Sequence, residues 1–341
     1  MAQKNRLLWI DILNIVACFG VLLLHCTNRE IHHYSGEESF NLYLGLFTHS
    51  FFIWPVTVFY MLSGYTNIRA GEFDTKKFYF RRLNRIFVPF FAWYLFYSIK
   101  YVVTIKGFDI SIEFFRNFFR LKYNGYLWFF IPLFSIYISI PFLRQIVFTA
   151  SRAQLKLFAV ASIILLSIVP MFFHILDIED YNNLFPMGSA FIYAAFLGYY
   201  IGNYEFSNKS LKLIYANGIV QTIIIIVGTY YLITKESCHY DYLLTYSHFP
   251  VLSVSVAVFC YFRYLQDKLI YLNSFGLGGV ISKIASLSFG IYLIQSLVLQ
   301  FLSKFEYIHS FMLLKFCIAY PLCAFLVLGL KHIPLVKRLV P

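Results

Sequence analysis

The sequence predicts an all-α membrane protein, a polytopic bundle of about ten transmembrane helices with both termini on the cytoplasmic side. Of its 341 residues, 60% are hydrophobic and only 13% are charged. A soluble domain carries roughly 25% charged residues, and a mean hydropathy of +0.69 is also typical of a membrane chain. The loops between apolar segments are short, so one membrane-embedded domain over residues 1–341 is expected.

The expected spans are the apolar segments that are long enough to cross a bilayer, which takes about 20 residues. By hydropathy and length, they cover residues 7–26, 42–65, 86–105, 125–143, 157–175, 188–205, 212–233, 250–265, 286–303 and 311–330.

The lysines and arginines orient these spans, because cytoplasmic loops carry an excess of them. With the N-terminus inside, the cytoplasmic segments hold Lys4, Arg6, Arg69, Lys76, Lys77, Arg81, Arg82, Arg85, Arg144, Arg152, Lys156, Lys209, Lys212, Arg263, Lys268, Lys283, Lys331, Lys337 and Arg338. The outer loops hold only Arg29, Lys106, Arg116, Arg120, Lys122, Lys235 and Lys304. The net charge of +12 therefore reflects membrane topology and does not indicate nucleic-acid binding.

Two further kinds of feature are not expected. No small-residue cleavage site follows the first apolar segment, so this span is expected to stay in the protein. The six cysteines form no CxxC and no metal-ligand spacing, so neither a disulfide framework nor a metal site is expected.

The first span contains two ionisable residues, Asp11 and His25, in the apolar stretch that begins near Leu7. Such residues are costly in a membrane and are functional candidates by default. At about 1.5 Å rise per residue they lie about 21 Å apart, near opposite membrane faces. Histidine is also the side chain suited to moving protons near neutral pH. The alternative is that His25 reaches to the interface and Asp11 anchors the helix start.

A basic segment, Asp74–Arg85, follows the second span, and its arginines alternate with aromatic residues as in an interfacial helix. Arg81, Arg82 and Arg85 have i, i+1 and i+4 spacing, so two of them share a helix face. Guanidinium groups on one face suit a multiply phosphorylated ligand such as a nucleotide-like cofactor. A topology anchor that binds anionic lipid is the alternative.

The second span ends in Ser63, Gly64 and Tyr65, next to the basic segment. Glycine allows a backbone or a ligand to approach closely, and tyrosine is common at the membrane interface. The same residues would also suit an ordinary end of a span.

Two further segments carry aromatic or polar residues, and the second of them could line a pocket. Residues 126–129, which include Trp128, lead into span four, and an aromatic belt explains them. In span nine, Ser288, Tyr292 and Gln295 lie on one stripe of the helix. Small polar residues of this kind also join helices.

The remaining histidines and one lysine are weaker candidates. His49 in span two and His174 near the outer end of span five could approach His25. Lys315 is a charge inside span ten whose partner the sequence does not name. Solvated loop positions are expected for His32, His33, His239 and His248.

In order along the chain, these segments resemble the acyltransferase-3 family of integral membrane acyltransferases, which includes bacterial O-acetyltransferases of surface polysaccharides. The resemblance rests on WID…H in span one, FFIWPVTVFYMLSGY, FYFRRLNRIFVPF, YLWFFIPLFSIYISIPFL and SLSFGIYLIQ. It covers essentially the whole chain, as the stand-alone form of the family.

The family signature is an arginine in span one followed eleven residues later by a histidine, about three helical turns apart. His25 matches the histidine, but Asn14 stands at the arginine position. Gln295 stands where the family often has a second histidine. These departures leave open altered donor handling, a divergent acceptor or an inactive paralogue.

The resemblance implies transfer of acetyl from cytoplasmic acetyl-CoA, the co-substrate, to a hydroxyl of a cell-surface or lipid-linked glycan at the plasma membrane. His25 would act as general base or as a transient acyl carrier, with Asn14 beside the thioester. Asp11 would have a structural or gating role. The donor would be held by Arg81, Arg82, Arg85, Ser63, Gly64 and Tyr65. The acceptor would be held by Trp128, Tyr292 and Gln295.

Two other functions remain open from the sequence. A lipid-linked glycan polymerase or flippase would be of similar size and composition, and it would use outer-loop arginines such as Arg116 and Arg120. A non-catalytic sensor with the same fold is the second alternative, and Asn14 favours it.

Overall fold

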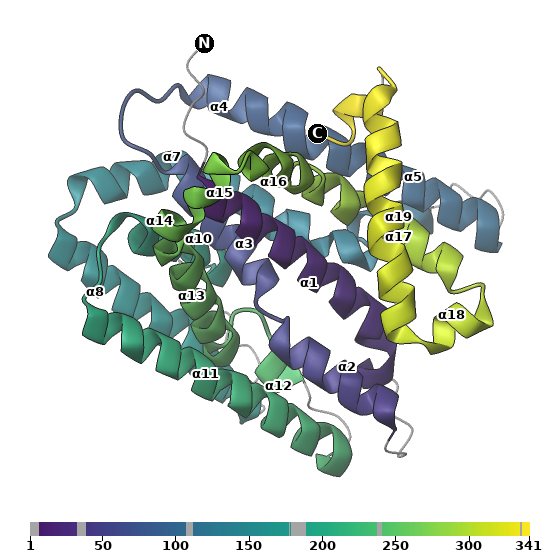
Figure 1. Cartoon of the computed structure of the whole chain (residues 1–341), viewed down its shortest axis with the longest axis horizontal. Helices are drawn as coiled ribbons and strands as arrows, with labels where there is room; N and C mark the ends of the chain where they lie inside the picture. The colour runs from purple at the N-terminus through teal and green to yellow at the C-terminus, as the bar shows by residue number, and fades with distance from the viewer. Residues whose placement is uncertain are drawn as a thin grey trace. The chain divides into compact units, whose positions relative to one another are not determined.

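A computed structural model describes residues 7–32, 39–106, 112–176, 178, 189–236, 241–334 and 336–341. Every regular element in these residues is a helix, which confirms the all-α prediction (Figure 1). Within them, 8 helices are long and apolar enough to cross a membrane. A further candidate consists of α16 (Leu277–Ala285) and α17 (Ser288–Leu302), which meet at a bend of 48°.

One of the ten expected spans has no helix long enough to cross a membrane among the described residues. The expected span 188–205 is α10 (Ala190–Asn203), whose 14 residues are too few for a membrane crossing. The expected span 42–65 corresponds to one candidate span, Phe40–Asn67, which consists of α2 (Phe40–Phe51) and α3 (Pro55–Asn67) with a short break between them. Pro55 explains the break, because proline lacks an N–H and is tolerated in the first turn of a helix. The orientation with both termini inside stays a prediction.

The chain divides into two compact units, each built from two separate stretches of sequence. Unit 1 comprises residues 1–70 and 139–285, and unit 2 comprises residues 71–138 and 286–341. Unit 1 has 13 Lys/Arg and 11 Asp/Glu, whereas unit 2 has 15 and 5, so unit 2 holds +10 of the net +12. The positive charge is therefore concentrated in one part of the chain.

The other helices of unit 1 are α1 (Leu8–His32), α8 (Arg152–Ile163), η4 (Ile164–Ile168), α9 (Val169–Ile175), α11 (Asn208–Tyr231), η6 (Leu232–Glu236), α12 (Asp241–Leu244), α13 (Phe249–Tyr264), α14 (Gln266–Leu269) and α15 (Tyr271–Ser274). Those of unit 2 are α4 (Thr75–Arg82), η1 (Leu83–Phe87), α5 (Val88–Tyr101), η2 (Val102–Lys106), α6 (Ile112–Phe119), η3 (Gly125–Phe129), α18 (Glu306–Ser310), α19 (Met312–His332) and η7 (Val336–Arg338). The boundary between the units falls within α7 (Phe130–Thr149).

In unit 1, α3 and α10 approach so closely that their backbones touch. A Cβ atom added to Gly64 would lie 1.8 Å from the carbonyl oxygen of Ala195. A Cβ added to Gly198 would lie 2.0 Å from the carbonyl oxygen of Met61. Two glycines that face the opposite backbone are the small-residue packing expected between membrane helices.

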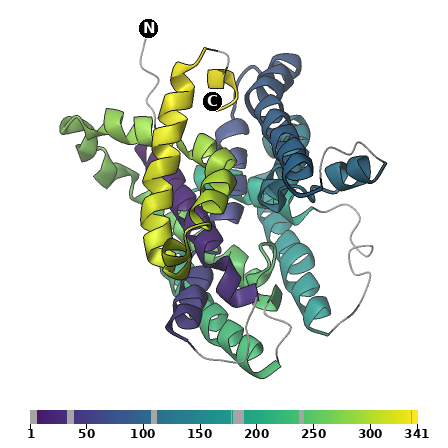
Figure 2. The same cartoon turned by 90° about the vertical axis from the view of Figure 1, so that its right-hand side faces the viewer.

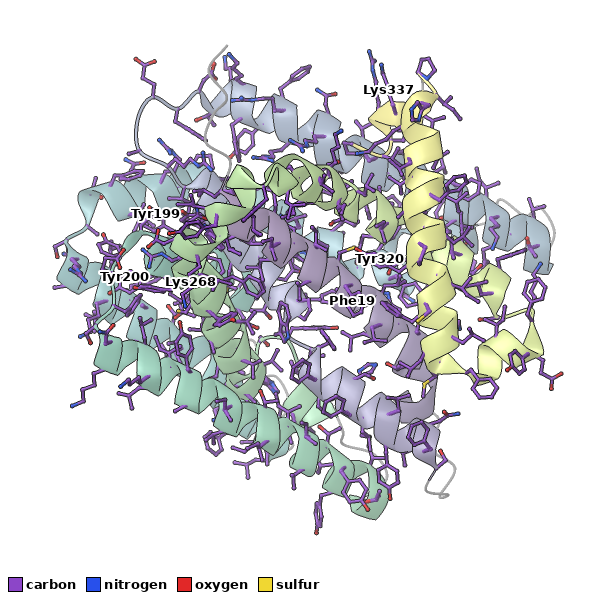
Figure 3. The ribbon with its side chains drawn as sticks, in the orientation of Figure 1. Phe19, Tyr199, Tyr200, Lys268, Tyr320 and Lys337 are labelled. Carbon is purple, nitrogen blue, oxygen red and sulfur yellow. The ribbon has the colours of Figure 1, made fainter. Side chains whose placement is uncertain are left out.

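Aromatic side chains also line α10. The ring of Tyr200, labelled in Figure 3, stacks on Phe196 with centroids 6.2 Å apart. The ring centroid of Tyr200 also lies 4.9 Å from that of Tyr204. The guanidinium of Arg152, at the start of α8, lies 5.1 Å from the Tyr204 ring centroid. These contacts tie the end of α10 to the beginning of α8.

In unit 2, α17 is the element that joins the others. Figure 2 shows α19, in yellow, beside α17, and a Cβ added to Gly290 would lie 2.7 Å from Val327 Cγ1. The hydroxyl of Tyr97 on α5 donates to the carbonyl of Leu293 on α17 at 2.7 Å. Helix α17 is thus held by both α5 and α19.

Candidate active site

Helix α1 carries both Asn14 and His25 in half-buried positions. Eleven residues correspond to about three turns, so the two side chains share one side of the helix at an axial separation of about 16 Å. The residues around them, including Leu13, Leu22 and Leu24, are buried. Both polar side chains therefore stand in largely apolar surroundings.

His49 on α2 contacts the turn of α1 that carries His25. Its Nε2 lies 3.2 Å from the carbonyl oxygen of Leu24, and the side chain is only 8% exposed. The hydroxyl of Thr27 donates to the carbonyls of Leu23 and Leu24, each at 3.2 Å. His49 thus contacts the turn of α1 that carries His25, and its approach to the His25 side chain stays a prediction.

Asp11 joins α1 to α16. Its carboxylate accepts a hydrogen bond from Ser282 Oγ at 2.6 Å, and the residue is 3% exposed. At the same end of α1, the backbone N–H of Trp9 donates to Gln266 Oε1 at 3.4 Å. These bonds hold the start of α1 against the segment between α13 and α16.

Ser63, Gly64 and Tyr65 lie in the last turns of α3. The hydroxyl of Ser63 donates to the carbonyl of Phe59 at 2.9 Å, and Gly64 faces α10 as described above. The ring of Tyr65 lies 5.2 Å from that of Trp9. All three residues thus have packing roles within unit 1, and their assignment to the donor stays a prediction.

The basic segment is helical, as expected, and it continues through η1 into α5 (Figure 1). Asp74 caps its start by accepting from the N–H of Lys77 at 2.9 Å. The Arg82 guanidinium lies over the rings of Phe78, at 5.3 Å, and Tyr137, at 5.0 Å. Arg82 is therefore engaged with aromatic side chains.

The neighbouring Arg81 and Arg85 are exposed. The Nε of Arg81 donates to the carbonyl of Lys77 at 3.2 Å, which extends its guanidinium along α4. Lys331 on α19 lies close enough to Arg85 for their charges to repel. Three cationic side chains are thus accessible in this part of unit 2.

Trp128, Tyr292 and Gln295 all belong to unit 2. The hydroxyl of Tyr292 donates to the carbonyl of Tyr126, so α17 is bonded to η3, the short helix that carries Trp128. Gln295 lies one turn further along α17 and is 1% exposed. Its Nε2 finds no acceptor among the described residues, and a buried unsatisfied donor costs about 1–3 kcal/mol.

The predicted site residues are therefore divided between the two units. Unit 1 holds Asn14, His25 and His49, and unit 2 holds the arginines, Trp128, Tyr292 and Gln295. Ser63, Gly64 and Tyr65, which were predicted to bind the donor together with the arginines, belong to unit 1. The sequence interpretation overlooked Lys100, which lines a cavity in unit 2. A lysine inside the apolar segment 86–105 was the signal that could have revealed it.

His248 corrects one expectation, because it is not solvated. It is 1% exposed, and its Nδ1 lies 2.7 Å from the carbonyl of Tyr242. The ring of His174 packs on both Tyr242, at 4.4 Å, and His248, at 5.3 Å. Lys315 gains a partner, since its Nζ donates to Ser303 Oγ at 2.9 Å.

Several residues named from the sequence lie outside the described residues: Lys4, Arg6, His33, Cys238 and His239. The side chains of four others are also outside that part: Arg29, His32, Lys106 and Lys235.

Comparison with known proteins identifies the family. The acyltransferase-3 family model, described as an acyltransferase domain, matches residues 7–331, which is nearly the whole chain. No curated protein and no solved structure matches the chain.

Proposed function

Because the chain belongs to the acyltransferase-3 family and is a membrane-bound acyltransferase, we propose that it transfers acetyl from acetyl-CoA to a glycan hydroxyl. The acceptor is a cell-surface or lipid-linked glycan, and the membrane is the plasma membrane. The observation that carries this proposal is His25, a half-buried histidine in an apolar helix whose adjacent carbonyl is bonded by His49.

The chemistry requires a base for the acceptor hydroxyl. A ring nitrogen of His25 takes the hydroxyl proton while the oxygen attacks the thioester carbonyl carbon, and the C–S bond breaks. The CoA sulfur leaves as a thiolate and receives the proton from His25. General-base catalysis of this kind contributes about 10²–10⁴-fold. Asn14 hydrogen-bonds the donor in place of the charged side chain typical of the family.

The donor phosphates bind at Arg81 and Arg85. Both side chains are exposed and unit 2 carries most of the positive charge of the chain. Arginine binds phosphate oxygens through two parallel hydrogen bonds, which suits the several phosphates of CoA. Arg82 stabilises the basic segment through the contacts of its guanidinium with Phe78 and Tyr137.

A non-catalytic sensor is the second candidate, because Asn14 supplies no positive charge to the reaction. Such a protein would bind acetyl-CoA and would be stabilised by it through mass action. It would form no acetylated product, which separates it from the enzyme.

The experiment compares the O-acetyl content of surface glycans in four strains: wild type, a deletion, and deletions that carry His25→Ala or His332→Ala. His332 is an exposed histidine at the end of α19 and serves as the matched control. We expect acetylation to be lost in the deletion and the His25→Ala strain and retained with His332→Ala. Full acetylation with His25→Ala would disprove the role of this residue as base.

The same samples separate the alternatives. Shortened or missing glycan with unchanged acetylation would indicate a polymerase or flippase instead. Acetyl-CoA-dependent thermal stabilisation of purified wild-type protein without any acetylated product would indicate the sensor.

A further inference from the structure

A cavity of about 670 Å³ lies in unit 2, between the end of α5 and the end of α17. This volume is in the range of small-molecule sites, about 300–1,000 Å³. Its lining residues are Tyr97, Lys100, Tyr101, Thr104, Tyr123, Leu297, Gln300, Phe301 and Lys304. None of these residues was assigned to the donor or to the reacting groups.

The cavity is lined by two cations and by no acidic side chain. Lys100 Nζ donates to Gln300 Oε1, and neither Lys100 nor Lys304 forms an ion pair within the described part of the chain. A third lysine, Lys315, bonds to Ser303 directly beside Lys304. Lys100 lies in the expected span 86–105, whereas Lys304 lies in the outer loop that follows span nine. Two positive side chains that face one cavity without an acidic partner favour an anion there.

The walls of the cavity suit a sugar ring. The rings of Tyr101 and Tyr123 pack with centroids 5.2 Å apart, and aromatic faces of this kind cover the apolar side of a ligand. Gln300 and Thr104 provide donors and acceptors for hydroxyl groups. The side-chain chemistry thus combines aromatic faces, neutral polar groups and positive charge.

Helix α17 carries Gln295 as well as part of the cavity wall. Five residues separate Gln295 from Gln300, a rise of about 7.5 Å. The buried Nε2 of Gln295 is the unsatisfied donor described above. At 3.6 residues per turn, Gln295 lies about 140° around α17 from Gln300, so it belongs to a different face of the helix and is not part of the cavity wall.

We propose that this cavity binds the negatively charged part of the acceptor, an acidic saccharide, through Lys100 and Lys304. The inference rests on the proposed acetyl transfer and names the class of its acceptor. The anionic group is a phosphate, as in a lipid-linked sugar, or a carboxylate, as in a uronic acid. Both interact with ammonium groups in the same way.

The test measures binding of three probes that share one ring: glucose, glucuronate and glucose 1-phosphate. Saturation-transfer NMR titrations use the full-length protein in phosphatidylcholine nanodiscs. The variants are Lys304→Gln, Lys100→Gln with Lys304→Gln, and the control Lys209→Gln on α11, an exposed lysine of unit 1. Lys304 is itself exposed, so its single substitution leaves the fold intact.

We expect the charged probes to bind at least tenfold more tightly than glucose. Lys304→Gln weakens this preference, the double variant abolishes it, and Lys209→Gln retains it. Tighter binding of glucuronate identifies a carboxylate acceptor, and tighter binding of glucose 1-phosphate identifies a phosphate. Equal affinity for all three probes, or an unchanged preference in the double variant, would overturn the proposal.

Two further measurements distinguish an acidic saccharide from a lipid headgroup and test the cavity independently of acetyl transfer. Phosphatidylglycerol added to the nanodiscs leaves probe binding unchanged, whereas competition would assign the cavity to a lipid headgroup and overturn the proposal. Thermal stabilisation by acetyl-CoA is recorded on the same samples. We expect acetyl-CoA to stabilise the lysine variants as much as the wild type. Loss of charged-probe preference with this stabilisation intact then reports on the cavity alone, whereas absence of the stabilisation in the wild type itself would count against the proposed acetyl transfer.

Discussion

His49 Nε2 lies 3.2 Å from the main-chain carbonyl oxygen of Leu24, the residue that precedes His25. A side chain of α2 thus holds the turn of α1 that carries the proposed base. Since Thr27 bonds to the same carbonyl, the position of His25 depends on contacts both within α1 and from α2. His49 is therefore a positioning residue, and its effect on the reaction can be measured.

Replacement of His49 by leucine is expected to lower kcat for acetyl transfer by about tenfold, because loss of a hydrogen bond of about 0.5–1.5 kcal/mol lets His25 move. KM for acetyl-CoA stays unchanged. His49→Gln, whose amide can donate to Leu24, restores most of the rate. Steady-state kinetics of purified protein check this, and equal loss in both variants would contradict a positioning role.

Gly64→Ala is expected to destabilise the protein by about 1–3 kcal/mol or to prevent folding, because the new methyl group would overlap the carbonyl of Ala195. The matched control is Gly279→Ala on α16, where a Cβ meets nothing within 4 Å. Alanine favours a helix over glycine by up to about 1 kcal/mol, so this control melts at or above the wild-type temperature. Melting curves in detergent compare the two.

The double variant Arg81→Gln with Arg85→Gln is expected to weaken acetyl-CoA binding by about tenfold or more, since each arginine loses charge-assisted bonds to phosphate. Its melting temperature without ligand stays near that of wild type because both side chains are exposed. Arg116→Gln with Arg120→Gln, on and just beyond α6, is the control with unchanged affinity. Titration calorimetry measures all three.

Arg82→Lys is expected to lower the melting temperature and leave the affinity for acetyl-CoA unchanged, which is the reverse of the result for the double variant. Lysine lacks the planar guanidinium that lies over Phe78 and Tyr137. The loss of this contact lowers the melting temperature. A change of affinity for acetyl-CoA without a change of melting temperature would instead place Arg82 in direct contact with the donor.

Glu205, whose side chain is 77% exposed, forms an ion pair of 2.9 Å with Arg263, whose side chain is 13% exposed, near the end of α10. The hydrogen bond from Arg263 lowers the pKa of the Glu205 carboxyl below its usual value, which is about 4.3. The pair therefore stabilises the folded state above the unfolded pKa, and this contribution is lost as pH falls through the lower folded pKa. We expect Glu205→Gln to reduce the loss of melting temperature below about pH 4.3.

A control variant isolates this pair. Glu113→Gln removes an exposed carboxylate on α6 that has no such arginine partner in the described residues. Its melting curves between acidic and neutral pH are expected to parallel those of the wild type. A flattened pH profile in both variants would point to net charge as the cause.

The sequence by itself determined the class of the protein and most of its helices, because apolar length and charge content act locally along the chain. It also singled out His25, Arg81, Arg85 and Gln295, since polar groups in or beside apolar segments are visible without a structure. The family motifs, read in order, led to the acyltransferase-3 family that the family model then identified.

Only the tertiary structure decided which side chains contact one another. His49 contacts Leu24, and the Arg82 guanidinium lies over the rings of Phe78 and Tyr137. His248 is buried. Each of these facts depends on how side chains pack in three dimensions. The cavity between Lys100 and Lys304 is likewise formed by α5 and α17, about 200 residues apart. Hydropathy describes each helix singly, whereas such sites arise where side chains of different helices meet.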